Sequence, residues 1–206
     1  MLVLPLPVSL DPDDGRARQV LMDVVVDGSR RVPMLLDTGT YRSSIPYDAQ
    51  RIDRCPPGEH SPAGETLVHV DTLCWGDLAG HELTVEMQPE GWNHPALFGM
   101  DVLGDHACYF RFTRGRLEVD GPPPSGSFEP LTTPSHRTPV VPVEWADVAI
   151  TAVWDTGAGI TVVDRGWAEA HPDVVSISAE MGRGTDSTGI TRSNPKERCR
   201  RAGSAL

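Results

Sequence analysis

Short apolar runs alternate with polar residues along most of this chain, a pattern typical of β-strands that bury one face against a core. Glycine and proline, with 20 and 19 residues, lie between the runs and favour tight turns. The pattern therefore predicts an all-β fold. In the first half, the predicted strands cover residues 3–8, 19–26, 31–36, 65–70, 82–87, 109–112 and 116–119.

Turn, helix and linker signals complete the predicted organisation. Asp27-Gly28, between the second and third strands, is a strong hairpin signal. One short helix is predicted over residues 99–107. Residues 121–138 are rich in Pro, Ser, Thr and Gly, which indicates a linker, and the strand pattern resumes after it. Residues 192–206 are basic and nearly devoid of apolar side chains, so they predict a disordered tail.

One short segment occurs twice. Residues 35–45 read LLDTGTYRSSI and residues 153–163 read VWDTGAGITVV. Both copies place apolar residues before an Asp-Thr-Gly tripeptide, a hydroxyl residue six positions after the aspartate, and an apolar residue two positions later. Asp37 and Asp155 each end a strand and enter a turn. Such an internal repeat predicts two copies of one structural element.

Two carboxyl groups that face each other have a specific chemistry. At a separation of about 3 Å both cannot ionise, so the pair shares one proton and titrates as a unit. One carboxylate can then deprotonate a water while the protonated partner polarises a substrate carbonyl. This chemistry hydrolyses an amide without a nucleophilic side chain or a metal, and it needs both copies. The alternative interpretation is that Asp37 and Asp155 each cap their own turn.

The other reactive residues carry no comparable pattern. The seven histidines show neither metal-ligand nor triad spacing, and Ser43 and Ser44 do not lie in a nucleophile elbow. The four cysteines lack Cys-x-x-Cys spacing, so separate reduced thiols are expected. The sequence therefore predicts no metal and no cofactor.

The charge and composition of the chain limit the classes of partner and the cellular location that we expect. The net charge of −11 argues against a nucleic-acid partner, because phosphate binding needs a basic surface. No apolar run approaches the length of a membrane span. The opening MLVLPLPVSL lacks a basic region and is broken by Pro5 and Pro7, which favours a first strand over a signal peptide and predicts a cytoplasmic protein. Lys196 is the only lysine among 18 basic residues, a bias typical of a GC-rich, bacterial coding genome.

With these motifs the chain resembles the retropepsin-like and pepsin-like aspartic proteases. Each lobe in that superfamily carries one Asp-Thr-Gly or Asp-Ser-Gly motif, and an apolar-apolar-Gly segment that leads into a short helix. Leu97-Phe98-Gly99, followed by MDVLGDHA, resembles the second signature. The resemblance implies that residues 1–120 form an acid-protease-like closed β-barrel lobe, which contains one short helix. It also implies a partial second lobe of the same type over residues 139–191.

The resemblance also implies an activity and the residues that carry it. The chain would be an aspartic endopeptidase that acts on a peptide or protein substrate, with Asp37 and Asp155 as its catalytic pair. Thr38 and Thr156 would each bond across to the opposite loop, and Gly39 and Gly157 would allow the tight turns. Ser43 and Thr161 would support the loops from beneath. Leu97, Phe98 and Gly99 would pack below the active-site loop.

The second half departs from this pattern, because it contains no second apolar-apolar-Gly segment followed by a helix. Three hypotheses follow. Asp37 and Asp155 form a dyad within one chain, or two first lobes form a homodimer that pairs two copies of Asp37. In the third, the chain is a catalytically silent peptide-binding module.

Overall fold

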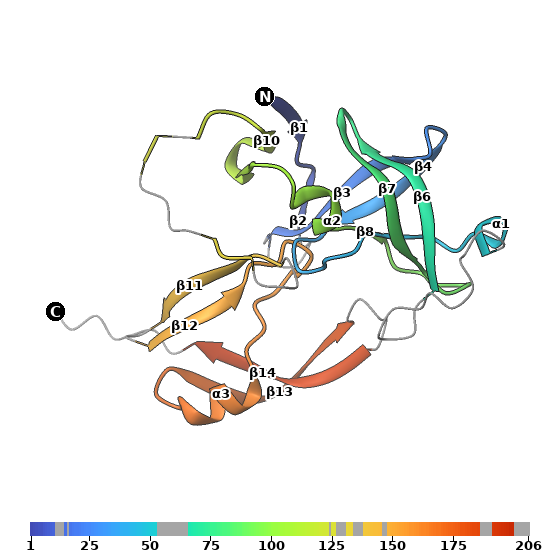
Figure 1. Cartoon of the computed structure of the whole chain (residues 1–206). Coiled ribbons are helices and arrows are strands. Elements are labelled where there is room, and N and C mark those ends of the chain that lie inside the picture. Colours follow the sequence, from blue (N-terminus) through green and yellow to red (C-terminus); the bar gives the residue numbers. More distant parts are fainter. Residues whose placement is uncertain are drawn as a thin grey trace. The chain divides into compact units, whose positions relative to one another are not determined.

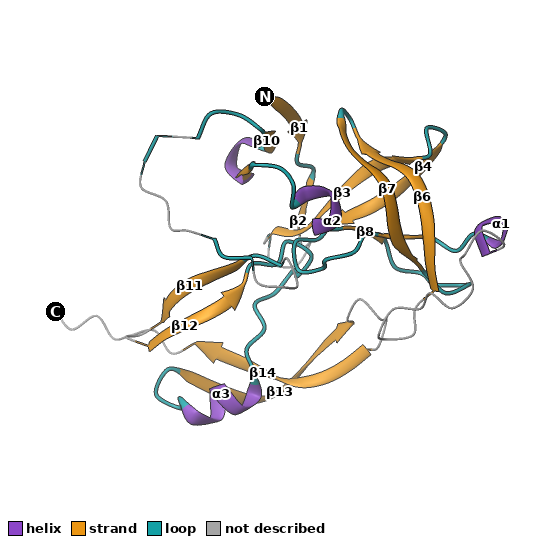
Figure 2. Cartoon of the chain, in the orientation of Figure 1, coloured by secondary structure: helices purple, strands orange, loops and turns teal. Residues whose placement is uncertain are grey.

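The computed structural model describes residues 1–10, 15, 17–52, 66–123, 125–126, 131–133, 138–145, 148–185 and 191–199. These residues form mostly β-strands with a few short helices, as the all-β prediction required (Figure 2). None of the described helices has the length and apolar character needed to cross a bilayer. The chain divides into two compact units, Met1–Val141 with Ala152–Gly159, and Pro142–Thr151 with Ile160–Leu206.

The first unit is built on a seven-stranded sheet (Figure 1). Its strands are β2 (Val8–Leu10), β3 (Ala17–Val26), β4 (Arg30–Leu36), β5 (Ser44–Ile45), β6 (Thr66–Trp75), β7 (Leu78–Met87) and β8 (Ala96–Phe98). The order is β5-β7-β6-β3-β4-β8, and β2 pairs with β3 outside this path. Most neighbours are antiparallel, but β4 pairs with β8, and β5 with β7, in parallel. The parallel pair β4–β8 brings the first Asp-Thr-Gly loop beside the Leu97-Phe98-Gly99 segment.

A three-stranded antiparallel sheet completes the first unit. It has the order β1 (Leu2–Pro5), β10 (Arg116–Val119), β9 (Cys108–Arg111), and the 3₁₀ turn η1 (Phe112–Arg114) joins β9 to β10. The core lies beneath the two sheets because alternate strand residues point inward. Its largest fully buried side chains include Phe98, Met34, Leu36, Ile45, Leu73 and Leu117.

The closed barrel that the resemblance implied is not found among the described residues. No ladder joins β5 to β8, the two ends of the seven-stranded sheet. β5 is only two residues long, and both of them pair with β7. Near these ends, Leu97 N donates to Ser44 Oγ at 2.9 Å, a side-chain contact outside any backbone ladder.

Several predicted elements have other bounds. The predicted strand over residues 3–8 is divided between β1, which pairs with β10, and β2, which pairs with β3. The helix α2 covers only Met100–Leu103 of the predicted 99–107, and Gly104 N closes it on Met100 O at 2.8 Å. β6 and β7 extend beyond the predicted segments to a tight turn at Gly76, whose φ of +59° favours glycine.

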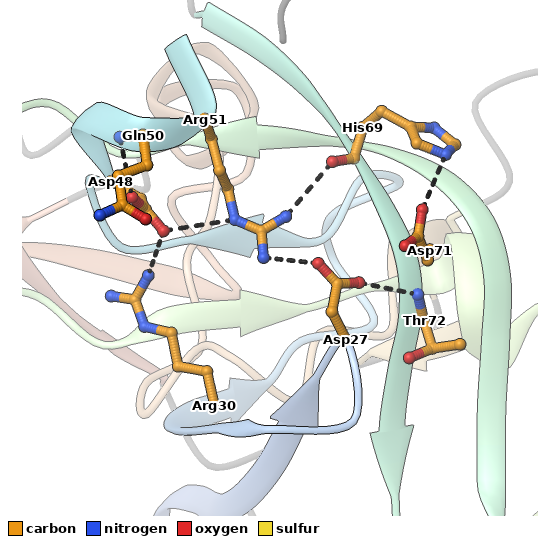
Figure 3. Close-up of polar contacts among 8 residues, drawn as sticks. All are labelled: Asp27, Arg30, Asp48, Gln50, Arg51, His69, Asp71 and Thr72. Carbon is orange, nitrogen blue, oxygen red and sulfur yellow. Dashed lines mark hydrogen bonds and ion pairs between the residues drawn. The ribbon is translucent and has the colours of Figure 1, made fainter. Parts of the chain in front are cut away.

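A short helix that the sequence pattern did not predict, α1 (Ala49–Ile52), is fixed by ionic contacts (Figure 3). Arg51 Nη2 lies 2.5 Å from Asp27 Oδ2, and Asp27 Oδ1 accepts from Thr72 N at 3.0 Å. Arg51 Nε also lies 3.4 Å from Asp48 Oδ2. Arg51 therefore links α1 to the β3–β4 turn and to β6.

The hairpin of β11 (Val140–Trp145) and β12 (Val148–Val153) contributes residues to both units. The second unit continues with α3 (Arg165–Ala170), β13 (Val175–Thr185) and β14 (Thr191–Cys199). A small apolar cluster lies in this unit. It contains Ala168, Val174 and Val175, with Trp145, Val148, Val163 and Trp167 packed against them.

β14 falls within the predicted disordered tail. Thr191–Cys199 pairs with β13 in an antiparallel ladder, and residues 200–206 lie outside the described part of the chain. An antiparallel ladder joins backbone groups and needs no apolar side chains, so a polar composition alone could not predict this strand. The tail prediction therefore differs from the structure up to Cys199.

Candidate active site

The two Asp-Thr-Gly loops meet within the first unit. The first loop follows β4, and Asp37 N donates to Phe98 O at 3.0 Å. The second loop follows β12, and its residues, Ala152–Gly159, cluster with the first unit rather than with the rest of the second half. The structure thus brings Asp37 and Asp155 together although 118 residues separate the two motifs.

Reciprocal hydrogen bonds between two threonines join the loops. Thr38 N donates to Thr156 Oγ1, and Thr156 N donates to Thr38 Oγ1, each at 3.1 Å. Each hydroxyl then donates to the backbone before the opposite aspartate: Thr38 Oγ1 to Trp154 O at 2.6 Å, and Thr156 Oγ1 to Leu36 O at 2.9 Å. The four bonds form a nearly symmetric set that fixes the two aspartates relative to each other.

Gly39 and Gly157 leave room for the carboxyl groups. A Cβ atom on Gly39 would lie 2.5 Å from Asp155 Cγ, and one on Gly157 would lie 2.5 Å from Asp37 Cγ. Neither glycine has the left-handed backbone that requires glycine in a turn. Their role in this structure is therefore space for the opposite carboxyl group, which differs from the tight-turn role implied by the resemblance.

The environments of the two aspartates differ. Asp37 is only 9% exposed, whereas Asp155 is exposed. Burial raises the pKa of Asp37 to about 7, and the neighbouring charge of Asp155 is the second cause of this rise. Backbone donors hold each carboxylate, because Asp37 Oδ1 accepts from Gly39 N at 2.8 Å and Asp155 Oδ1 from Gly157 N at 2.7 Å. Asp37 can therefore keep a proton up to neutral pH.

Ser43 and Asp101 support the first loop from beneath. Ser43 Oγ donates to Asp101 Oδ1 at 2.6 Å and accepts from Gly99 N at 2.9 Å. Ser43 N donates to the other carboxylate oxygen at 2.8 Å. Burial raises the pKa of Asp101. No sequence motif marks Asp101, and its only local signal is its place as an acidic residue in the first turn of α2.

The Leu97-Phe98-Gly99 segment lies against this loop. Phe98 is fully buried and packs its ring edge-on to Trp75 at 6.1 Å between centroids. A Cβ atom on Gly99 would lie 3.0 Å from the backbone of Tyr41 and Arg42, so glycine permits the close approach of α2 to the loop. Thr161, the counterpart of Ser43 in the repeat, belongs to the second unit and is exposed. Its supporting role stays a prediction.

Among the described residues, one group of possible metal ligands lies on the β6–β7 hairpin. Atoms of His69, Asp71 and Glu82 lie within 4.8 Å of one another, a grouping that spacing along the sequence did not reveal. All three residues are exposed. His69 Nε2 already lies 3.2 Å from Glu82 Oε2 and 3.6 Å from Asp71 Oδ1, so contacts among the three side chains themselves account for the arrangement.

Comparisons with known proteins give a distant structural likeness. No family model and no curated protein matches the chain. The fold is similar to the crystal structure of a retropepsin-like aspartic protease from Rickettsia conorii, with a TM-score of 0.40 and 14% sequence identity. The match covers 57% of this chain and 90% of that one. A likeness this distant carries no inference about activity. Any such inference rests on the residues of the site.

Proposed function

We propose that this protein is a retropepsin-like aspartic endopeptidase that hydrolyses peptide bonds through a water held between Asp37 and Asp155. One observation carries the proposal: each Asp-Thr-Gly loop is fixed to the other by the reciprocal threonine bonds, with each aspartate in the space left by the opposite glycine. Two aspartates that merely capped their own turns would need no such cross-loop contacts.

The asymmetry of the pair supports a division of roles. Asp37, whose pKa is raised to about 7, would donate a proton to the oxygen of the scissile carbonyl. Asp155 would take a proton from the water, whose oxygen then attacks the carbonyl carbon. Transfer of that proton from Asp155 to the amide nitrogen would break the C–N bond and release the amine, while one hydroxyl of the intermediate would return its proton to Asp37 and leave the carboxylic acid. Gly157 N and Ala158 N both donate to Asp155 Oδ1, which orients this carboxylate for the step.

The substrate class follows from this chemistry, and the assembly from the threonine bonds. An extended peptide or an unfolded protein segment presents an accessible amide, so either would be the substrate.

Thr156 occupies the positions on Thr38 that a second copy of Thr38 would take in a homodimer of first lobes. The single-chain dyad is therefore the form that we propose, and the homodimer would require residues 152–159 to leave.

The test is cleavage of casein between pH 3 and 7, with and without pepstatin, by wild type, Asp37→Asn and Asp155→Asn. Asp77→Asn is the matched control, because Asp77 is an exposed turn aspartate of the β6–β7 hairpin. We expect loss of cleavage in both dyad variants and unchanged cleavage in the control.

The other outcomes separate the alternatives. Loss in Asp37→Asn alone would indicate a homodimer of first lobes. A folded wild type that cleaves nothing, yet binds unstructured peptides, would indicate the catalytically silent peptide-binding module and overturn the proposal.

A further inference from the structure

Trp154 immediately precedes Asp155 and packs against the first unit's small sheet. Its ring meets that of Phe110 on β9 edge-on, with the centroids 4.8 Å apart and the planes at 84°. Phe110 in turn stacks on Phe112, with 5.8 Å between centroids. Edge-to-face pairs of this geometry stabilise a contact beyond the area they bury.

The backbone of Trp154 is held by the same unit. Trp154 N donates to Pro139 O at 2.9 Å, and Trp154 O accepts from Thr38 Oγ1 at 2.6 Å. The residue before Asp155 is therefore fixed by two backbone hydrogen bonds and one aromatic contact, all of them with residues of the first unit.

The two loops differ in how their apolar residues are buried. Before Asp37, Leu35 and Leu36 are 7% and 0% exposed and belong to the core. Their counterparts in the repeat are Val153, which is 54% exposed, and Trp154, which is half-buried. The second loop thus lacks the core packing that fixes the first, and the Trp154 ring is its apolar contact with the first unit.

We propose that Trp154 is a positioning residue: its ring, packed on Phe110, anchors residues 152–159 to the rest of the first unit and holds Asp155 opposite Asp37. The anchoring is a property of the fold alone. Its consequence for hydrolysis rests on the proposed function.

Amide hydrogen exchange at Thr38 and Thr156 tests the anchoring without any assay of activity. Both amides donate to hydroxyls across the two loops, so their protection reports whether the loops are joined. The variants are Trp154→Ala and the conservative Trp154→Phe. Trp92→Ala is the matched control, because Trp92 is also half-buried but packs its ring on His94 at 5.5 Å.

We expect Trp154→Ala to speed exchange at both amides by roughly tenfold, Trp154→Phe to restore most of the protection, and Trp92→Ala to change neither amide. Thermal unfolding of each variant shows whether the rest of the unit stays folded. Unchanged exchange at both amides in a folded Trp154→Ala protein would overturn the proposal. Equal acceleration in Trp92→Ala would also overturn it, since a general loss of stability would then explain the result.

Kinetics test the catalytic consequence separately. In Trp154→Ala we expect kcat on a peptide substrate to fall with KM nearly unchanged, because the variant misplaces a reacting group and leaves residues 1–141 of the first unit folded. A rise in KM at constant kcat would contradict a positioning role. If wild type cleaves nothing while exchange responds as expected, the proposed function fails and the anchoring stands.

Discussion

Replacing Gly157 with alanine places a methyl group where the carboxyl group of Asp37 now lies. The new Cβ atom would be 2.5 Å from Asp37 Cγ and 2.6 Å from Oδ2. Asp37 is buried and bonded to Gly39 N, so it has little room to turn away. The mirror change, Gly39→Ala, meets Asp155 at the same 2.5 Å, but that side chain is exposed and can move into solvent.

The size of the effect follows from the overlap. Carbon atoms in contact lie about 3.5–4.0 Å apart, so Gly157→Ala must separate the methyl and the carboxyl group by about 1 Å or more. A displacement of this size in a catalytic group costs about 10²-fold in rate. Overpacking in a tight site also lowers the free energy of unfolding by about 1–3 kcal/mol. Gly39→Ala should show smaller losses of both kinds.

Three measurements check this reasoning. Proteolysis gives kcat, urea unfolding gives stability, and carboxyl ¹³C NMR gives the pKa of Asp37, which should change in Gly157→Ala because burial and the charge of Asp155 both act through the position of this carboxyl group. Gly121→Ala is the control, since its new methyl would meet only the Met1 side chain, which can move. Wild-type kcat, stability and Asp37 titration in Gly157→Ala would refute the structural role of this glycine. Equal losses of kcat and stability in Gly157→Ala and Gly39→Ala would refute the expected difference between buried Asp37 and exposed Asp155.

Two further changes probe the first loop. Because the pKa of Asp37 is raised from 3.8 to about 7, the folded state binds its proton more tightly than the unfolded chain. The contribution of Asp37 to stability is therefore largest below about pH 4 and falls by up to about 4 kcal/mol as the pH rises to 7. Asp37→Asn should flatten this decline in urea unfolding across pH, and an unchanged slope would contradict the assigned pKa. Ser43→Ala should lower the free energy of unfolding by about 1–3 kcal/mol, because it leaves Gly99 N without its acceptor. The control Ser9→Ala removes one half-buried hydrogen bond and should lower it by less. Equal unfolding midpoints for the two variants would contradict the supporting role of Ser43.

The strands that the sequence predicts well are those in which every second position is apolar. β4 is an example, since Val32, Met34 and Leu36 all point into the core. The β6–β7 hairpin was predicted only in part. Ala79-Gly80 near its turn offers little apolar signal, although Leu78 and Gly80 are buried there. Backbone pairing with β6 extends β7 through this stretch, and side-chain periodicity does not report backbone pairing.

The repeat identified the residues of the candidate site, but not all of the contacts that hold them. Asp101 lies 58 residues from Ser43, and nothing in the local pattern joins the two. Trp154 is one apolar residue among several before Asp155, and its contact with Phe110 depends on how distant segments meet. The role of Gly157 likewise depends on the position of Asp37. Long-range contacts of this kind are set by tertiary structure, which a single sequence does not display.

The placement of Ala152–Gly159 in the first unit bears on how the second half can change during evolution. This segment supplies Asp155, Thr156 and Gly157, and it is the part of the second half that the candidate dyad uses. Residues elsewhere in that half can vary, or be shortened, while the segment still reaches its place. Selection to keep both aspartates together would therefore act most strongly on a stretch little longer than the motif itself.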